Sequence, residues 1–139
     1  MSVKSRLAAV LRARRAQEDM ARGAVAKATM ELRRAHDVVT DHEDALADHS
    51  LPEEADPRAY LAAIAAGRSL ASALDQAVSL ARSAEVDADT TYDLLRAAAR
   101  RRRGVEKLVE RAAEARRLEE LAAEQRDTDE LSTRGWEQS

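Results

Sequence analysis

One row of residues, spaced by alternating steps of four and three, runs through the first third of the chain and constrains its fold more than any other feature. Such a row lies on one side of an α-helix and forms the seam of a left-handed coiled coil. Three polar residues, Arg14, Glu18 and His42, interrupt a row that is otherwise apolar. The sequence therefore predicts a first helix over about 4–49 that packs on another helix. The full row is Leu7, Leu11, Arg14, Glu18, Ala21, Val25, Ala28, Leu32, Ala35, Val39, His42 and Leu46.

Two nearby prolines end this first helix. Pro52 and Pro57 cannot both lie inside one helix, because proline lacks the amide proton and clashes with the preceding turn. Asp56 followed by Pro57 suits a helix start, with the aspartate as N-cap and the proline at the first helical position. A short link between two long helices favours an antiparallel hairpin, so we expect a turn over 50–57.

A second helix is predicted from about residue 57 to about residue 128. Its spacing of four and three continues to a run of four arginines and is expected to shift in phase there. Poor helix formers over 85–90 leave open whether this helix is continuous, and 129–139 lose the periodicity and are expected to form a frayed tail. The row before the shift is Leu70, Leu74, Ala77, Ala81, Ala84, Ala88, Thr91, Leu95 and Ala98, and the row after it is Val105, Leu108, Ala112, Ala115 and Ala122.

The composition suits long helices better than a compact core. Of the 139 residues 45% are hydrophobic, but much of this is alanine, phenylalanine is absent and only 2% are aromatic. Alanine has the highest helix propensity but buries little apolar surface. We therefore expect an all-α fold, with one elongated domain over 1–139 in which two long helices form an antiparallel coiled-coil hairpin.

Several classes of protein are disfavoured. The chain has no cysteine, no apolar N-terminal stretch typical of a signal peptide, and no run of about 18 apolar residues that could span a membrane, which predicts a soluble intracellular protein. It also lacks a glycine-rich phosphate loop and any recognisable nucleophile arrangement, and a two-helix rod has no concave site, so neither an enzyme nor a cofactor is expected. His42 and His49 are seven residues apart, too far for two ligands of one metal ion, so with His36 we interpret them as seam or surface histidines and expect no metal.

Charge is segregated along the chain. Eight acidic residues and no Lys or Arg lie between Asp37 and Asp56, whereas 4–34 and 96–117 are rich in arginine. Antiparallel folding would bring the two basic stretches together at the open end, which predicts a docking surface for an acidic partner; the alternative is a merely solvated face. The candidate residues, called the basic cluster below, are Arg12, Arg14, Arg15, Arg100, Arg101, Arg102, Arg103, Lys107 and Arg111.

The same fold would leave the second helix longer than the first. A turn at 50–57 would set the N-terminus beside about 100–105, so that about 25 residues of the second helix project beyond it. An isolated helix gains little stability without packing, so the projection also predicts a partner. Nucleic acid is disfavoured as that partner, because the net charge is −3 and no aromatic residues interleave the arginines.

Both ends of the sequence resemble the FliJ-type flagellar export proteins. The resemblance is carried by two stretches, RLAAVLRARRAQEDMARGAVAKA at the start and RRRRGVEKLVERAAEARRLEELAAEQRDTDELSTR at the end. It runs over nearly the full chain. Its residues are Arg6, Leu7, Val10, Leu11, Val105, Glu106, Lys107, Leu108, Glu110 and Arg111, with Glu124, Gln125, Asp129 and Glu130 near the end.

The resemblance implies a non-enzymatic component of the flagellar type III protein export apparatus. Its expected partners are the hexameric export ATPase, on which the terminal coiled coil docks, the export gate in the membrane, and export chaperones whose delivery it assists. It also implies a cytoplasmic protein that is peripheral to the inner-membrane export apparatus through these partners only. The basic cluster would then enter an acidic channel of the ATPase ring, with the acidic turn region facing the gate.

Other interpretations of the same rod stay open. It could be a stalk subunit of a rotary ATPase, the corresponding protein of a virulence secretion system, or a generic dimeric coiled-coil adaptor. The sequence does not fix the export system, the oligomeric state of the free chain, or which face meets which partner.

Overall fold

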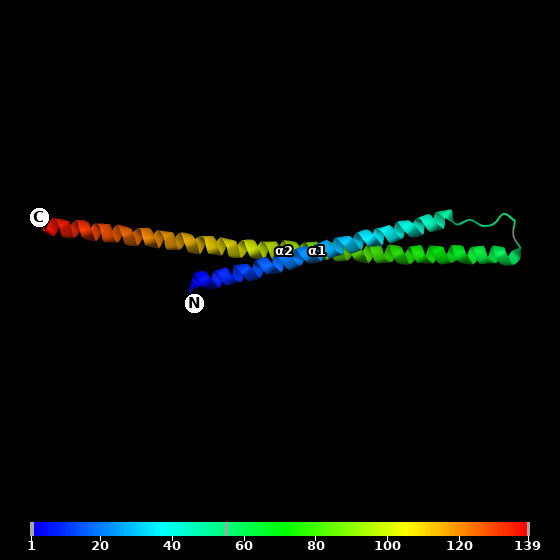
Figure 1. Ribbon diagram of the computed structural model, residues 1–139, viewed down its shortest axis with the longest axis horizontal. Coiled ribbons are helices and arrows are strands. Elements are labelled where there is room, and N and C mark those ends of the chain that lie inside the picture. The colour runs from blue at the N-terminus through cyan, green and yellow to red at the C-terminus, as the bar shows by residue number, and fades with distance from the viewer. Residues whose placement is uncertain (1, 55, 139) are drawn as a thin grey trace. The chain divides into compact units, whose positions relative to one another are not determined.

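The computed structural model describes residues 2–54 and 56–138, and within these ranges it contains two helices and no strand. Helix α1 spans Val3–Asp48 and helix α2 spans Pro57–Glu137, 46 and 81 residues long (Figure 1). The two helices pack against each other in a hairpin, which confirms the predicted all-α fold. The contacts divide the chain into two units. We call 2–18 with 97–138 the terminal unit, and 19–54 with 56–96 the link unit; whether they act as one domain stays a prediction.

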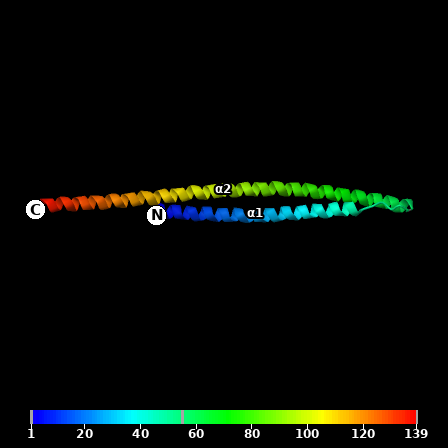
Figure 2. The same cartoon turned by 90° about the horizontal axis from the view of Figure 1, so that it is seen from above.

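The predicted seam of α1 is confirmed residue by residue. All the members of the row from Leu7 to Leu46 are buried or half-buried, whereas every other described residue of α1 except Ala8 is exposed. In the link unit the segments 19–48 and 57–96 run side by side (Figure 2). Periodic burial of one face, rather than a compact core, is therefore what holds α1 in place.

The predicted seam of α2 is confirmed as far as Ala98, but the expected change of phase is wrong. Burial continues in steps of four and three through Arg102, Val105, Val109 and Ala112, without a shift at the arginine run. Leu108, which the shifted row placed at the seam, is 49% exposed. The reason is that an arginine occupies a seam position, so the apolar pattern loses its signal there while the helix keeps its phase.

The start of α2 follows the predicted capping pattern. The amide of Ala59 donates to Oδ1 of Asp56 at 2.7 Å, and the amide of Tyr60 donates to the Asp56 carbonyl at 3.1 Å. Asp56 is thus the N-cap and Pro57 the first helical residue, as expected. Ala55, within the predicted turn, lies outside the described residues, as do Met1 and Ser139 at the chain ends.

His49 connects the end of α1 to α2. Its Nε2 lies 2.9 Å from the Ala63 carbonyl, to which the Nε2–H tautomer donates. A Cβ at Gly67 would approach the same Nε2 to 3.0 Å, so the glycine leaves room for the imidazole ring. The half-buried His49 is therefore a packing residue where the two helices meet.

The expected register is wrong, and the position of His49 explains why. Because α1 ends beside Ala63 and Gly67, α2 has already run more than a full turn when pairing begins. Opposite residues are consequently His36 with Glu85, and Arg15 with Glu106. In the terminal unit this register sets Val3 beside about Leu118, whereas folding symmetrically about the turn would have set it beside 100–105.

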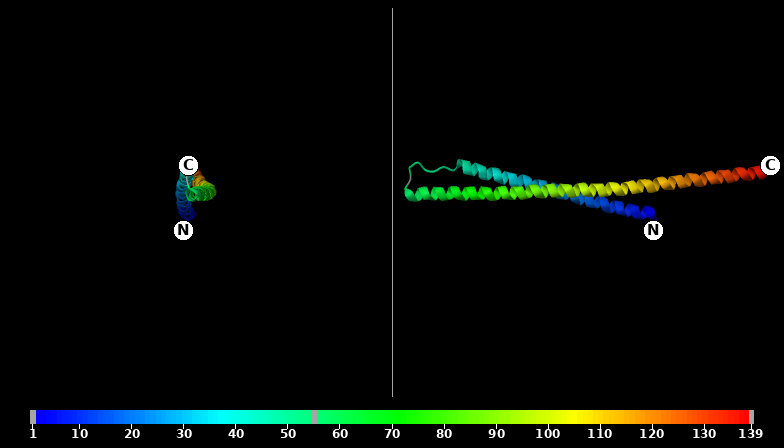
Figure 3. Two further views of the ribbon diagram at one scale, coloured as in Figure 1. Left: turned by 90° about the vertical axis from the view of Figure 1, so that its right-hand side faces the viewer. Right: turned by 180° about the vertical axis from the view of Figure 1, so that it is seen from behind.

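Helix α2 is continuous through 85–90, and it extends into residues 129–137, which were expected to form a frayed tail. Hydroxyls of Thr90 and Thr91 donate to backbone carbonyls of the preceding turn, at 2.9 and 3.0 Å, without interrupting the helix. The residues beyond 128 are helical as far as Glu137, where pairs such as Glu130–Arg134 at 2.8 Å support the helix without an apolar seam. Within the terminal unit α2 passes the N-terminal end of α1 (Figure 3, right). We call Glu119–Glu137 the α2 extension.

Candidate docking surface

The structure brings both parts of the basic cluster into the terminal unit. Residues 12–15 of α1 and 100–111 of α2 belong to this unit, as antiparallel folding predicts. Seven of the nine side chains are on exposed residues, and the half-buried ones are Arg14 and Arg102. Their exact faces differ, and the differences decide which of them are available to a partner.

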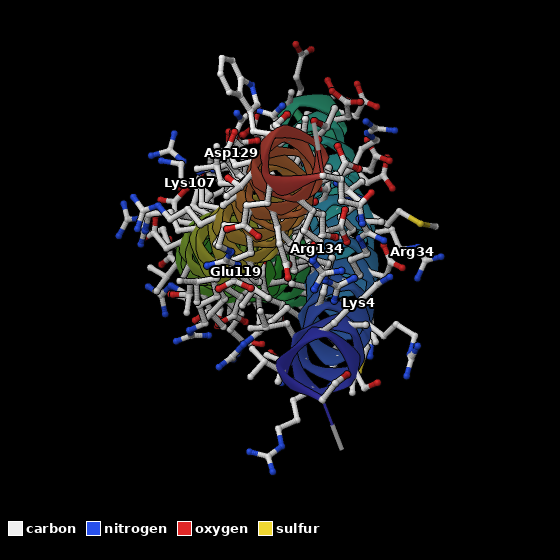
Figure 4. The ribbon with its side chains drawn as sticks, turned by 90° about the vertical axis from the view of Figure 1, so that its left-hand side faces the viewer. Lys4, Arg34, Lys107, Glu119, Asp129 and Arg134 are labelled. Atoms are coloured by element: carbon white, nitrogen blue, oxygen red, sulfur yellow. The ribbon has the colours of Figure 1, made fainter. Side chains whose placement is uncertain are left out.

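Four basic residues of α2 share the face turned away from α1. Arg100, Arg103, Lys107 and Arg111 follow one another in steps of three and four, so they lie in one stripe along the helix. All four are exposed, whereas the seam residues on the opposite face are not. Figure 4 shows Lys107 projecting from α2 on the side away from Lys4 of α1. We call these four residues the outer basic stripe.

Arg102 differs from its neighbours because it lies in the seam. Its Nε donates to Oε2 of Glu18 at 2.5 Å, and its Nη1 donates to Oε2 of Glu106 at 2.9 Å. Glu18 is only 4% exposed. The hydrogen bond to Glu18, followed by the nearby carboxylate charges of Glu106 and Glu18, raises the pKa of the Arg102 guanidinium. Arg102 therefore joins α1 to α2, and its charge is already matched within the chain.

The arginines of α1 also differ from one another. Arg15 approaches Glu106 to 3.5 Å and completes a four-residue ionic network with Glu18 and Arg102. Arg14, at a seam position, donates to the side chain of Gln17 at 3.0 Å. Arg12 is exposed. The outer basic stripe is thus the largest group of exposed cations in the cluster, and Arg12 and Arg101 are exposed outside it.

Glu18 and Glu106 were not predicted as members of this network. One signal is present in the sequence, because Glu18 is an acidic interruption of the α1 seam. A buried carboxylate needs a cationic or hydrogen-bonding group on the facing helix. Continuing the α2 row four residues past Ala98 leads to Arg102, so an unshifted phase would have found the pair.

Beyond the network, an exposed pair supports the helix just before the extension. Arg117 donates to Glu114 at 2.7 and 3.0 Å, and this hydrogen bond holds the pKa of the Glu114 carboxyl below its ordinary value. A lowered folded-state pKa means that the pair stabilises the helix above the ordinary pKa of a glutamate and is lost as the pH falls through the lower value. In Arg117→Gln we expect the Glu114 pKa to rise towards its ordinary value, as followed by carboxyl NMR titration; an unchanged titration would contradict the pair.

Among the described residues, no group of three or more His, Asp or Glu side chains is arranged to hold a metal ion. Neither described helix contains a stretch that is both long and apolar enough for a bilayer crossing. A hollow of about 450 Å³ is lined by Asp75, Gln76, Ser79 and Leu80, all from one stretch of α2. It is open to solvent rather than enclosed.

These features define the class of the protein: an α-helical hairpin that carries a basic face in its terminal unit. The family model for the flagellar FliJ protein matches residues 3–139, essentially the whole chain. The chain therefore belongs to the FliJ family, which comprises non-catalytic components of flagellar export, and its role is related to that export. Comparison with curated proteins finds no match, and comparison with solved structures finds none either.

Proposed function

We propose that the chain docks on the hexameric export ATPase through the outer basic stripe, as part of the flagellar type III export apparatus. The observation that carries this proposal is the stripe itself: four cations on the face of α2 that α1 does not cover. Like charges held on one exposed face raise the local potential and attract an acidic surface. Arg12 and Arg101 are exposed as well but are not part of the stripe. Arg102 is excluded because it donates to Glu18 and Glu106.

The mechanism that this surface supports is electrostatic and mechanical. The terminal unit would enter an acidic channel of the ATPase ring and favour ring assembly or turnover. FliJ family membership supports a wider role as well, in which the chain contacts the export gate and assists the delivery of chaperones and their substrates. The protein would then work in the cytoplasm, at the inner membrane, through these partners.

The test is a triple charge reversal, Arg100→Glu, Arg103→Glu and Lys107→Glu, which leaves Arg102 and the network unchanged. Since placing like charges together at an interface costs several kcal/mol, we expect binding to the purified ATPase ring to weaken about a hundredfold and stimulation of ATP hydrolysis to disappear. The matched control reverses Arg58, Arg68 and Arg82, which are exposed on α2 in the link unit. Equal stimulation by both triple variants would overturn this placement.

A further inference from the structure

A second surface of the terminal unit is apolar and faces solvent. Leu108, Leu118 and Leu121 of α2 are 49, 54 and 48% exposed, and Ala115 and Ala122 between them are also exposed. These five residues lie on one side of α2 because their spacing follows the helical repeat. We call them the leucine stripe. It does not coincide with the seam, whose last half-buried members before residue 118 are Val109 and Ala112.

Helix α1 runs beside the first part of the stripe without covering it, because Leu108, Ala115 and Leu118 are exposed, and it ends before the rest. The register of Arg15 with Glu106 and of Glu18 with Arg102 carries α1 only as far as about Leu118. The next seam positions of α2 are Arg116, Glu119, Ala123 and Arg126, so a single alanine is the apolar residue that continues the seam over this stretch. Because an isolated helix gains most of its stability from packing, the apolar side of the extension is suited to a different helix.

Charge along α2 identifies that other helix. Between Arg96 and Arg117 there are nine basic and three acidic residues, whereas between Glu119 and Glu137 there are seven acidic and two basic ones. The sign changes at the centre of the leucine stripe. In a second α2 that runs in the opposite direction, the acidic part would therefore lie against the basic part of the first α2. The basic part of the second would lie against the acidic part of the first, on the other side of Leu118.

We propose that two copies of this chain pair through the part of the leucine stripe around Leu118 and Ala122, with the two α2 helices antiparallel. Such an interface is isologous, because the same stripe serves both copies about a twofold axis. Setting Leu118 against Ala122 of the second copy also sets Arg111 against Asp129. In the same register Trp136 falls opposite Gly104, where nothing lies within 4 Å of a Cβ position and an indole has room. A parallel pair would instead set basic against basic.

The pairing has a consequence for the basic surface. Arg111 belongs to the outer basic stripe, and the acidic extension of one copy would cover the stripe of the other. The paired form and a form bound to an acidic partner therefore exclude each other. The inference is independent of the proposed function, since it rests on the leucine stripe and the charge order alone.

Crosslinking tests the pairing directly, because the chain contains no cysteine. Leu121→Cys, close to the proposed axis, is expected to form a disulfide-linked dimer on mild oxidation. Ser132→Cys alone is expected to stay monomeric, but to crosslink when mixed with Leu108→Cys. A dimer of Ser132→Cys alone would indicate parallel helices and overturn the proposal, as would failure of the mixed pair.

Sedimentation equilibrium provides the second measurement and the matched variants. A pair of moderate affinity dissociates over the range from about 1 to 100 µM, so the mass of the wild-type chain should rise from 15.3 kDa towards twice that value as the concentration increases. The rise should be smaller at high salt, because salt screens the charge pairs. Leu118→Glu should stay monomeric, whereas Leu131→Glu, which changes a 68% exposed leucine outside the stripe, should pair like the wild type. A wild-type chain that stays monomeric, or a Leu118→Glu variant that still pairs, contradicts the inference. Failure of the pairing would not count against the proposed docking on the ATPase, because the charge-reversal test of that docking does not involve Leu118.

Discussion

Replacing Glu18 by arginine is expected to release the first part of α1 from α2. The variant places two guanidinium groups in one layer of the seam, where Glu18 is only 4% exposed. A buried charge that loses its partner is strongly unfavourable, and repulsion adds to the loss. We expect the amide exchange protection of residues 3–18 to fall about tenfold or more, because these residues would open without unfolding of the rest. Hydrogen exchange resolved by residue measures this.

Two further variants separate charge from position. Arg102→Glu should have the same effect as Glu18→Arg, and combining the two should restore much of the protection, because the pair is then reversed rather than broken. Glu31→Arg makes the same charge change at an exposed position of α1 and should leave 3–18 protected. If Glu18→Arg exchanges like the wild type, the network is not what holds the terminal unit together.

Replacing the Glu18–Arg102 pair by two apolar residues tests whether the network contributes to stability or to register. Glu18→Leu with Arg102→Leu should be at least as stable as the wild type, because well-packed apolar residues often equal or exceed a buried ion pair. Charged residues at seam positions specify register instead, since a slipped alignment leaves them without partners. In the terminal unit the Glu18–Arg102 pair therefore determines which part of α2 is covered by α1. The remaining part of α2 stays available to other helices.

The parts of the fold that the sequence predicts are those in which small and apolar residues mark the seam. Steps of four and three predicted the α1 seam and the α2 seam as far as Ala98, because small and apolar residues carry a periodic signal. Arg102 carries no such signal, so the phase after the arginine run was predicted wrongly. The register was also out of reach, because it depends on how far the chain travels between His49 and Ala63. The helix beyond residue 128 was not predicted either, because local charge pairs support it and these leave no periodic apolar pattern in the sequence.

The basic cluster was partly predictable for a related reason. Its location in one unit follows from antiparallel folding alone, which the two prolines indicate. Which of its members face outward depends on the phase of α2, and that phase assigns Arg102 to the seam and Arg100, Arg103 and Lys107 to the opposite face. The sequence therefore predicts that these residues gather in one unit, but not which of them lie in the seam and which face outward.

Enlarging a seam alanine is expected to destabilise the link unit. Ala77 and Ala81 are 4 and 5% exposed, and the most buried apolar residues of the described chain are all alanines, which indicates that the helices approach closely. Ala81→Leu adds three carbon atoms at such a contact, and overpacking of this kind costs about 1–3 kcal/mol. Urea unfolding followed by circular dichroism should show a lower midpoint.

The matched control is Ala71→Leu, which makes the same change at an exposed position of α2 in the same unit. Because leucine is also a good helix former, this variant should unfold within about 0.5 kcal/mol of the wild type. A difference between the two variants therefore measures the closeness of the two helices rather than helix propensity. If Ala81→Leu is instead as stable as Ala71→Leu or more so, the added side chain has found room, and the seam is held by apolar area rather than by the small size of alanine.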